Sequence, residues 1–428
     1  MLTGNFANAG IMLIAVAIAA RGLGPEVFGS MVLVLALAST TERLIRFETW
    51  QPLIKFVADE EHVATPLRMA RLYGLGLMLD LITASVAALI TILAALLFKH
   101  VFGWHSIPPE ASAIYAIAMI CNVTGAPGAA LRLAGQFRTI AYVQIPANIV
   151  RAMLAGLCLW QGAGLLGYIA VWTVAEVGYR LATLWLGIRA LTARGIPNPA
   201  SVRLTGLLKD FPGFLPFAWS INLSTMLRTL TTDADELVVG AMAGQSAASM
   251  YNIAKRIVKF GQEIGNQVLT VIYPELARMW SCRDGALFRA TIVQTQIVLC
   301  GFALLIVAAA WLGGSWLIRL GPGDSYLPTY PLLEIQVLAV LFTMHAAPGR
   351  SALLSIGRYR AILGIAAIGA AAFYAFLIPA VLLYGAAGAS FAHVILAFIT
   401  AALIDLEWRR HSKAKPVPPK PITSVETN

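Results

Sequence analysis

The chain has few charged residues, few cysteines and few histidines for its length. Only 12% of its 428 residues are charged, whereas a soluble globular chain carries about 25%. Its four cysteines form no CxxC pair and its six histidines show no HExxH spacing, which argues against disulfide bridges and a zinc site. The composition therefore excludes a soluble enzyme, and we expect neither a metal nor any other cofactor.

Apolar residues take the place of the missing charges. They make up 59% of the chain, and the mean hydropathy is +0.76. The apolar content is spread from end to end, which excludes one or two anchors on a soluble domain. Because a membrane-spanning helix needs about 20 apolar residues, a chain of this length can hold roughly a dozen. The expected fold class is an all-α polytopic membrane protein.

Apolar runs separated by charged residues or by Gly/Pro clusters predict twelve spans. Their expected bounds are 1–20, 27–57, 72–98, 110–133, 139–160, 165–190, 214–239, 248–273, 288–312, 330–348, 361–383 and 387–408.

The two halves of the chain resemble each other at a fixed offset. Pro127-Gly128 and the following ALRLAGQFR recur as Pro348-Gly349 and ALLSIGRYR, an offset of 222, and a weaker match relates Gly24 to Gly244. Duplication of a six-helix unit would keep both units in one orientation; chance recurrence of small-residue turns is the alternative. The repeat predicts an N-terminal lobe (1–193), a cytoplasmic linker (194–212), a C-terminal lobe (213–412) and a disordered cytoplasmic tail (413–428).

The formal charge of +10 comes from 31 Lys and Arg against 21 Asp and Glu. In a soluble protein this excess would suggest nucleic acid as a partner. Here 20 of the basic residues fall in loops and a tail on one side of the expected membrane and only three fall on the other. Because basic residues collect in cytoplasmic loops, we expect a multi-pass bacterial inner-membrane protein with both termini in the cytoplasm and no nucleic-acid partner.

Eight basic residues remain inside the expected spans. Each costs about 2.5–3.5 kcal/mol at mid-bilayer on insertion scales, so some must pair, snorkel or face water. Arg180 has Glu176 one turn before it, an order that favours an intrahelical ion pair. The eight are Arg43, Arg46, Arg151, Arg180, Arg228, Lys255, Arg256 and Lys259.

Polar residues at helical spacing form stripes on four of these spans. On the second span the stripe is Ser39, Glu42, Arg43, Arg46 and Trp50; on the seventh, Ser220, Ser224, Arg228, Thr231 and Asp235; on the eighth, Asn252, Lys255, Arg256, Lys259 and Glu263. Lys259 lies near mid-bilayer, whereas Arg43 and Arg46 could also snorkel to the cytoplasm. On the fifth span Gln144, Asn148 and Arg151 face either a cavity or another helix.

Together the stripes predict a hydrated cavity with a positive charge. The basic residues outnumber the acidic ones (Glu42, Asp235 and Glu263), which suits an anionic cargo that carries phosphate. The candidate substrate-binding residues are Arg43, Arg46, Arg151, Arg228, Lys255, Arg256 and Lys259. The weaker candidates for ion coupling are Asp80, Asp235 and Glu263, although Asp80 could instead pair with a nearby Arg.

Several motifs resemble those of a known transporter family. They are RGLGPEVFG (21–29), FETWQPLIK (47–55), LDL (79–81), AGQFR (134–138), YPELA (273–277) and GPGDSYLP (321–328). Their order and spacing are similar to the polysaccharide transport branch, with its Wzx-type flippases, of the multidrug/oligosaccharidyl-lipid/polysaccharide exporter superfamily. The resemblance covers almost the whole chain.

This resemblance implies a flippase and not an enzyme. Its cargo would be an undecaprenyl-diphosphate-linked oligosaccharide, moved by alternating access for polysaccharide or lipopolysaccharide biosynthesis. Two six-helix lobes would enclose a cation-lined cavity. The expected partners are the lipid-linked oligosaccharide and membrane lipids, with the polysaccharide polymerase and chain-length machinery as further candidates.

Other functions remain open from the sequence. A multidrug or cation antiporter of the same superfamily would need a cavity dominated by carboxylates, and the lipid II flippase branch usually has two additional helices. A membrane-bound glycan polymerase or ligase usually needs a large periplasmic loop, whereas the longest expected outer loop here is 313–329.

Overall fold

The computed structural model describes residues 2–47, 49–60, 65–101, 108–203, 206–219, 222, 226, 234–282 and 285–411. These residues form helices and short turns, with no strand among them. Eight of the described helical stretches are long and apolar enough to cross a membrane. The prediction of an all-α, multi-pass membrane protein is therefore confirmed.

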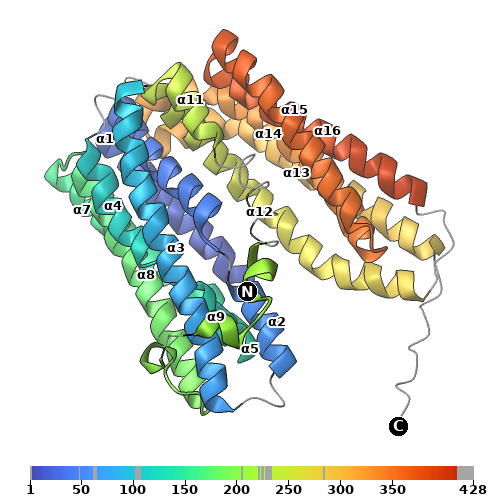
Figure 1. Ribbon diagram of the computed structural model, residues 1–428. Coiled ribbons are helices and arrows are strands. Elements are labelled where there is room, and N and C mark those ends of the chain that lie inside the picture. The colour runs from blue at the N-terminus through green and yellow to red at the C-terminus, as the bar shows by residue number, and fades with distance from the viewer. Residues whose placement is uncertain are drawn as a thin grey trace.

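Two lobes follow each other along the chain (Figure 1). The helices of the first lobe are α1 (Leu2–Ile45), α2 (Trp50–Glu60), α3 (Pro66–Val101), α4 (Pro109–Ile120), α5 (Gly125–Leu133), α6 (Phe137–Tyr142), α7 (Gln144–Gln161) and α8 (Leu165–Ala193). After η1 (Pro199–Ser201) and α9 (Leu207–Asp210), the second lobe comprises α11 (Asp235–Ala243), α12 (Gln245–Ser281), α13 (Gly285–Leu320), η2 (Asp324–Thr329), α14 (Tyr330–Ser355), α15 (Tyr359–Tyr384) and α16 (Ala386–His411).

The described part of the expected linker packs on the first lobe. Leu207 and Phe211 are buried in a cluster with residues of α2 and α3, and Phe214, at the start of the expected C-terminal lobe, lies in the same cluster. Asp210 forms an ion pair with Arg71 of α3. The chain between the lobes is thus attached to the N-terminal lobe along this stretch.

Three expected spans are interrupted, and Asp80 lies at two of the interruptions. The second span ends as α1 at Ile45 and resumes as α2 at Trp50, and the fourth is divided into α4 and α5. The Asp80 carboxylate accepts a hydrogen bond from the Thr49 hydroxyl at 2.7 Å and from the backbone N–H groups of Gly125 (2.9 Å) and Ala126 (3.2 Å). A buried carboxylate satisfies the free N–H groups that begin α5, so both breaks are stabilised from α3.

The remaining break lies in the expected fifth span. This span is divided at Val143 into α6 and α7, and α7 has Pro146 close to its start. Proline cannot donate a backbone hydrogen bond and is tolerated in the first turn of a helix. The interpretation of 27–57, 110–133 and 139–160 as continuous helices was therefore wrong, and Trp50 does not continue the stripe of Arg43.

Backbone geometry confirms the internal repeat. At the end of α5, the N–H groups of Ala134, Gly135 and Gln136 donate to the carbonyls of Ala130, Arg132 and Leu131. At the end of α14, the residues 222 positions later make the same three bonds. Gly135 and Gly357 both adopt positive φ, 70° and 78°, where glycine is favoured. The weaker match also holds, since Gly24 (φ 71°, ψ 170°) and Gly244 (φ 90°, ψ 173°) share one conformation.

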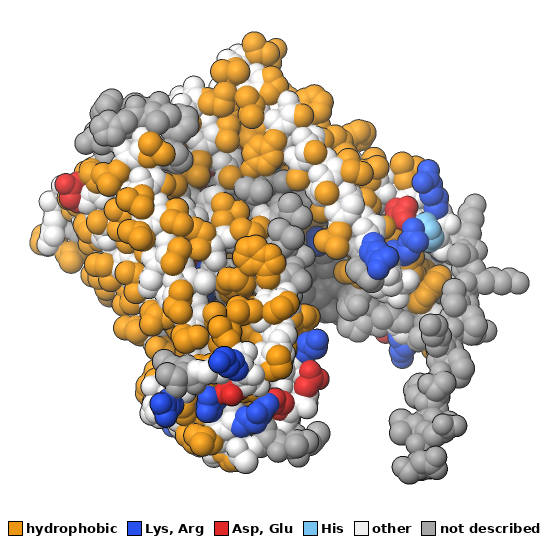
Figure 2. All heavy atoms as spheres, in the orientation of Figure 1, with side chains coloured by type: hydrophobic (Ala, Val, Ile, Leu, Met, Phe, Trp, Pro, Cys, Tyr) orange, Lys and Arg blue, Asp and Glu red, His pale blue; other side chains and the backbone are white. Residues whose placement is uncertain are grey.

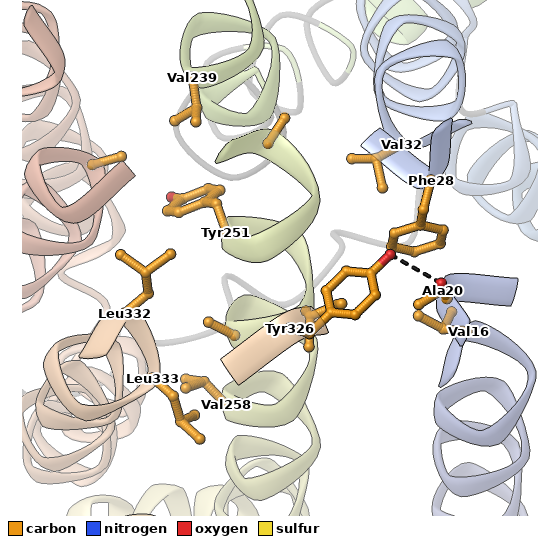
Figure 3. Packing of buried hydrophobic residues seen from close by; sticks show 14 of the residues in the cluster. Val16, Ala20, Phe28, Val32, Val239, Tyr251, Val258, Tyr326, Leu332 and Leu333 are labelled. Carbon is orange, nitrogen blue, oxygen red and sulfur yellow. Dashed lines mark hydrogen bonds between the residues drawn. The ribbon is translucent and has the colours of Figure 1, made fainter. Parts of the chain in front are cut away.

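The lobes pack together at the end of the molecule where α1 is kinked, which we term the closed end. Figure 3 shows Tyr326 of η2 reaching α1, where its hydroxyl donates to the Ala20 carbonyl at 3.0 Å. Its ring meets Phe28 edge to face. Ser30 donates to the Gln245 side chain at 3.2 Å, and Gly29 approaches the Gln245 backbone so closely that a Cβ would overlap its carbonyl.

The lobes separate toward the opposite end (Figure 1). Figure 2 shows hydrophobic side chains over most of the visible surface and Lys and Arg side chains gathered at this end of both lobes. We term it the basic end; its described residues include Arg68, Arg71, Arg132, Arg358 and Arg410. The apolar surface is the one expected of a protein embedded in lipid.

Candidate functional site

A central cavity of about 550 Å³ lies between the lobes. The first lobe supplies side chains from α1, α4, α7 and α8, and the second from α11 and α12. Its charged lining residues are Arg43, Arg151, Glu176, Glu236, Lys255, Arg256, Lys259 and Glu263. Cavities of this size that hold converging polar groups are typical ligand sites.

The structure brings most of the predicted binding residues to this cavity. Arg43, Arg151, Lys255, Arg256 and Lys259 all line it, as does Glu263. Arg46 lies at the break after α1, where it donates to the Thr124 hydroxyl at 3.3 Å and is not among the lining residues. Asp80, on α3, does not line the cavity but contacts the backbone at the start of α5. Arg228 falls outside the described residues.

An ion network in the first lobe holds Arg151 in place. Its guanidinium donates to Glu176 at 2.8 Å and to Asn148 at 2.7 Å, and its side chain is buried. Glu176 also binds Arg180 at 3.1 Å, as the sequence predicted for this intrahelical pair. Arg180 also forms an ion pair with Glu42, at 3.3 Å. Arg151 therefore has its charge balanced locally while part of it faces the cavity.

A second network holds Lys255. Its ammonium lies 2.7 Å and 2.9 Å from the two carboxylate oxygens of Asp235 and 3.2 Å from Glu236. Asp235 is fully buried and also meets the Tyr251 hydroxyl at 2.5 Å and the His393 ring at 2.7 Å. Asp235 thus lies behind the cavity wall, joined to it through Lys255.

The positive charge that faces the cavity is smaller than the residue count suggests. Three carboxylates, those of Glu176, Glu236 and Glu263, line the cavity beside its five basic side chains, which leaves a formal excess of two positive charges. Arg256 donates to the neutral amide oxygen of Asn252 at 2.8 Å. Arg43 and Lys259 are exposed side chains. A cavity with this balance favours an anion.

Three important residues were missed from the sequence. Glu236 lines the cavity, His393 contacts Asp235 from α16, and Trp172 lies 5.6 Å beneath the Arg151 guanidinium. Glu236 immediately follows Asp235 and could have been found from its position. His393 is 158 residues from Asp235, so no local spacing indicates the contact.

The sequence profile described as polysaccharide biosynthesis protein matches residues 1–280. The chain belongs to the polysaccharide biosynthesis protein family. The chain is 23% identical to the Escherichia coli K12 inner membrane protein YghQ over 331 residues, which cover 77% of this chain and 92% of YghQ. The predicted membership of the polysaccharide transport branch is confirmed.

Solved structures share the fold of this polysaccharide biosynthesis protein. An inward-facing multidrug resistance MATE family transporter of the MOP superfamily matches with a TM-score of 0.75 at 15% identity, covering 95% of each chain. The lipid II flippase MurJ, in an inward closed conformation, matches with a TM-score of 0.72 at 14% identity, covering 95% of this chain and 87% of MurJ. The chain therefore shares its fold with a membrane transporter and with a flippase.

Proposed function

We propose that the protein is a flippase that moves a polyprenyl-diphosphate-linked oligosaccharide, such as an undecaprenyl-diphosphate-linked unit, across the bacterial inner membrane. The observation that carries this proposal is the excess of basic side chains in a cavity shared by both lobes. Arg43 comes from α1, and Arg256 and Lys259 come from α12. Membership of the polysaccharide biosynthesis protein family supports the cargo class.

The proposed cargo matches the cavity chemically. A diphosphate accepts hydrogen bonds at several oxygens, and guanidinium groups bind phosphate with strong, charge-assisted bonds. The hydrocarbon tail would stay in the lipid beside the gap between the lobes. A cationic drug would meet Arg43, Arg256 and Lys259 at the same place, so an anion is favoured over the cargo of a cation antiporter.

The arrangement of the lobes supports alternating access. The described conformation is packed at the closed end and separated at the basic end. An anion held jointly by Arg43 on one lobe and by Arg256 and Lys259 on the other would draw the basic end together. Rocking about the cavity would then open the closed end, which we propose faces the periplasm. Both termini would then lie in the cytoplasm, as the loop charges predict.

Coupling to a proton gradient would use the Lys255 network. The network joins His393 on α16 to Asp235 on α11, whose carboxylate also contacts Tyr251 and Lys255 on α12. A change in the charge of this network would alter the hold of Asp235 on Lys255 and so the charge that faces the cavity. Glu263 lines the cavity as a further coupling candidate, whereas Asp80 has no contact with it.

The export of surface polysaccharide tests the proposed function. The double variant Arg256→Ala/Lys259→Ala, expressed in a strain that lacks its own copy of the gene, should lose most export while the protein reaches its normal level in the membrane. Arg189→Ala is the matched control, because Arg189 is exposed, stacks on Trp185 and lies outside the cavity. Full export by the double variant at normal protein level would contradict the proposal.

A further inference from the structure

A second cavity lies between α15 and α16 at the basic end of the second lobe, and we term it the α15–α16 groove. Its volume is about 770 Å³, and it shares no lining residue with the central cavity. One face of each helix forms its walls, at the spacing i, i+3, i+4, i+7. These faces are Ala361, Gly364, Ile365 and Ile368 on α15, and Leu403, Leu406, Glu407 and Arg410 on α16.

The polar groups of the groove gather at one of its ends. Arg358, Arg360 and Arg410 supply three guanidinium groups there, against the single carboxylate of Glu407. Arg358 donates to Glu407 at 2.7 Å, so the carboxylate is already engaged by one of the three. Figure 2 shows Lys or Arg side chains gathered beside acidic and histidine side chains at this end of the lobe.

The other part of the groove is apolar and open. Ile368 and Leu406 are 55% and 53% exposed, and Ile365 is buried at the floor. A Cβ added to Gly364 would meet no atom within 4 Å, so the glycine leaves the wall open. From Arg360 to Ile368 the helix rises by about 12 Å, which places an apolar channel directly beneath a basic rim.

We propose that the α15–α16 groove binds one anionic glycerophospholipid of the membrane leaflet at the basic end. The rim would hold the phosphate headgroup, and the apolar wall would hold an acyl chain. Basic pockets between membrane helices bind anionic headgroups in this way. Free phosphate would make no use of the apolar wall. The chain beyond His411 carries Lys413 and Lys415. Their positive charge would be repelled by the basic rim, so this part of the chain does not suit the groove.

Native mass spectrometry of the full-length purified protein tests this site. Dioleoyl phosphatidylglycerol and dioleoyl phosphatidylcholine would be titrated separately, and the wild type should bind the first more tightly. Arg360→Ala/Arg410→Ala should weaken phosphatidylglycerol binding roughly 30-fold, because each basic residue contributes about 1 kcal/mol to an anionic headgroup. Arg278→Ala should change nothing, since Arg278 is exposed, pairs with Glu275 and lies outside the groove.

Gly364→Leu is a second variant that keeps every charge and fills the open channel. It should weaken phosphatidylglycerol binding while leaving the thermal stability of the protein unchanged, since no atom occupies that space. Equal wild-type affinity for the two lipids would overturn the proposal, as would full binding by both groove variants. One-for-one displacement of phosphatidylglycerol from the groove by farnesyl diphosphate would also overturn it, because the groove would then belong to the polyprenyl cargo.

Discussion

The ammonium group of Lys255 lies between two carboxylates, 2.7 Å from Asp235 and 3.2 Å from Glu236. Lys255 lines the central cavity and Asp235 is buried behind it. The availability of this cation to a cargo in the cavity therefore depends on what else holds Asp235. His393 of α16 holds the same carboxylate at 2.7 Å, so a residue outside the cavity can change the charge within it.

Removing the Asp235 charge should destabilise the protein. Asp235→Asn would remove from Lys255 the carboxylate that lies 2.7 Å away, and breaking a buried ion pair costs about 3–5 kcal/mol. Adding Lys255→Met should recover much of this loss, because the uncompensated ammonium is then absent. Thermal unfolding in detergent measures both effects, with Asp324→Asn as the exposed control. Equal stability of Asp235→Asn and the wild type would show that the ion pair does not stabilise the fold.

His393 should affect anion binding in the cavity although it lies outside it. Its ring contacts the Asp235 carboxylate that also binds Lys255, so His393→Ala would leave that carboxylate to Lys255 and Tyr251. Affinity for farnesyl diphosphate should therefore fall in His393→Ala, whereas Arg189→Ala should bind as the wild type does. Equal affinity in His393→Ala and the wild type would show that His393 does not control the charge of the cavity.

Asp80 should matter for stability more than for coupling. Its carboxylate accepts hydrogen bonds from the backbone at the start of α5 and from Thr49, and losing one partner of a buried hydrogen bond costs about 1–3 kcal/mol. Asp80→Asn should lower the unfolding temperature and leave the pH dependence of export unchanged, and Asp59→Asn, on an exposed residue of α2, should do neither. A changed pH profile at unchanged stability would favour a coupling role.

The close approach of Gly29 to Gln245 should control the closed end. In Gly29→Ala the new Cβ would overlap the Gln245 carbonyl, so α1 and α12 must separate there. Spin labels at the exposed positions Glu26 and Ser325 should report longer distances by electron–electron double resonance. Gly301→Ala is the matched control, because its Cβ meets no atom within 4 Å. Unchanged distances in Gly29→Ala would show that this contact does not hold the lobes together.

The sequence could predict the features that depend on local spacing. The Glu176–Arg180 pair is four residues apart on one helix, and the matching turns at Gly135 and Gly357 carry the same motif. The cavity-lining residues Arg256 and Lys259 could be predicted because a cation in a membrane helix must find water or a partner.

The sequence could not predict the features that depend on distant contacts. The breaks before Trp50 and before Gly125 are stabilised by Asp80 on another helix, while the apolar pattern continues through them. Ion pairs with distant residues also lower the charge of the cavity below that expected from the sequence. Glu176 pairs with Arg151 and Glu236 pairs with Lys255. Neither the partner nor its distance can be derived from hydropathy.

The most direct test of an anion-selective cavity compares two ligands of opposite charge on the purified protein. Wild-type protein should bind farnesyl diphosphate and should not bind tetraphenylphosphonium. Each of Arg256→Ala and Lys259→Ala should weaken diphosphate binding about tenfold or more, since a hydrogen bond to a charged group contributes about 1.5–3 kcal/mol; Arg189→Ala should bind as the wild type does. Binding of tetraphenylphosphonium in the cavity, with no binding of farnesyl diphosphate, would contradict the account.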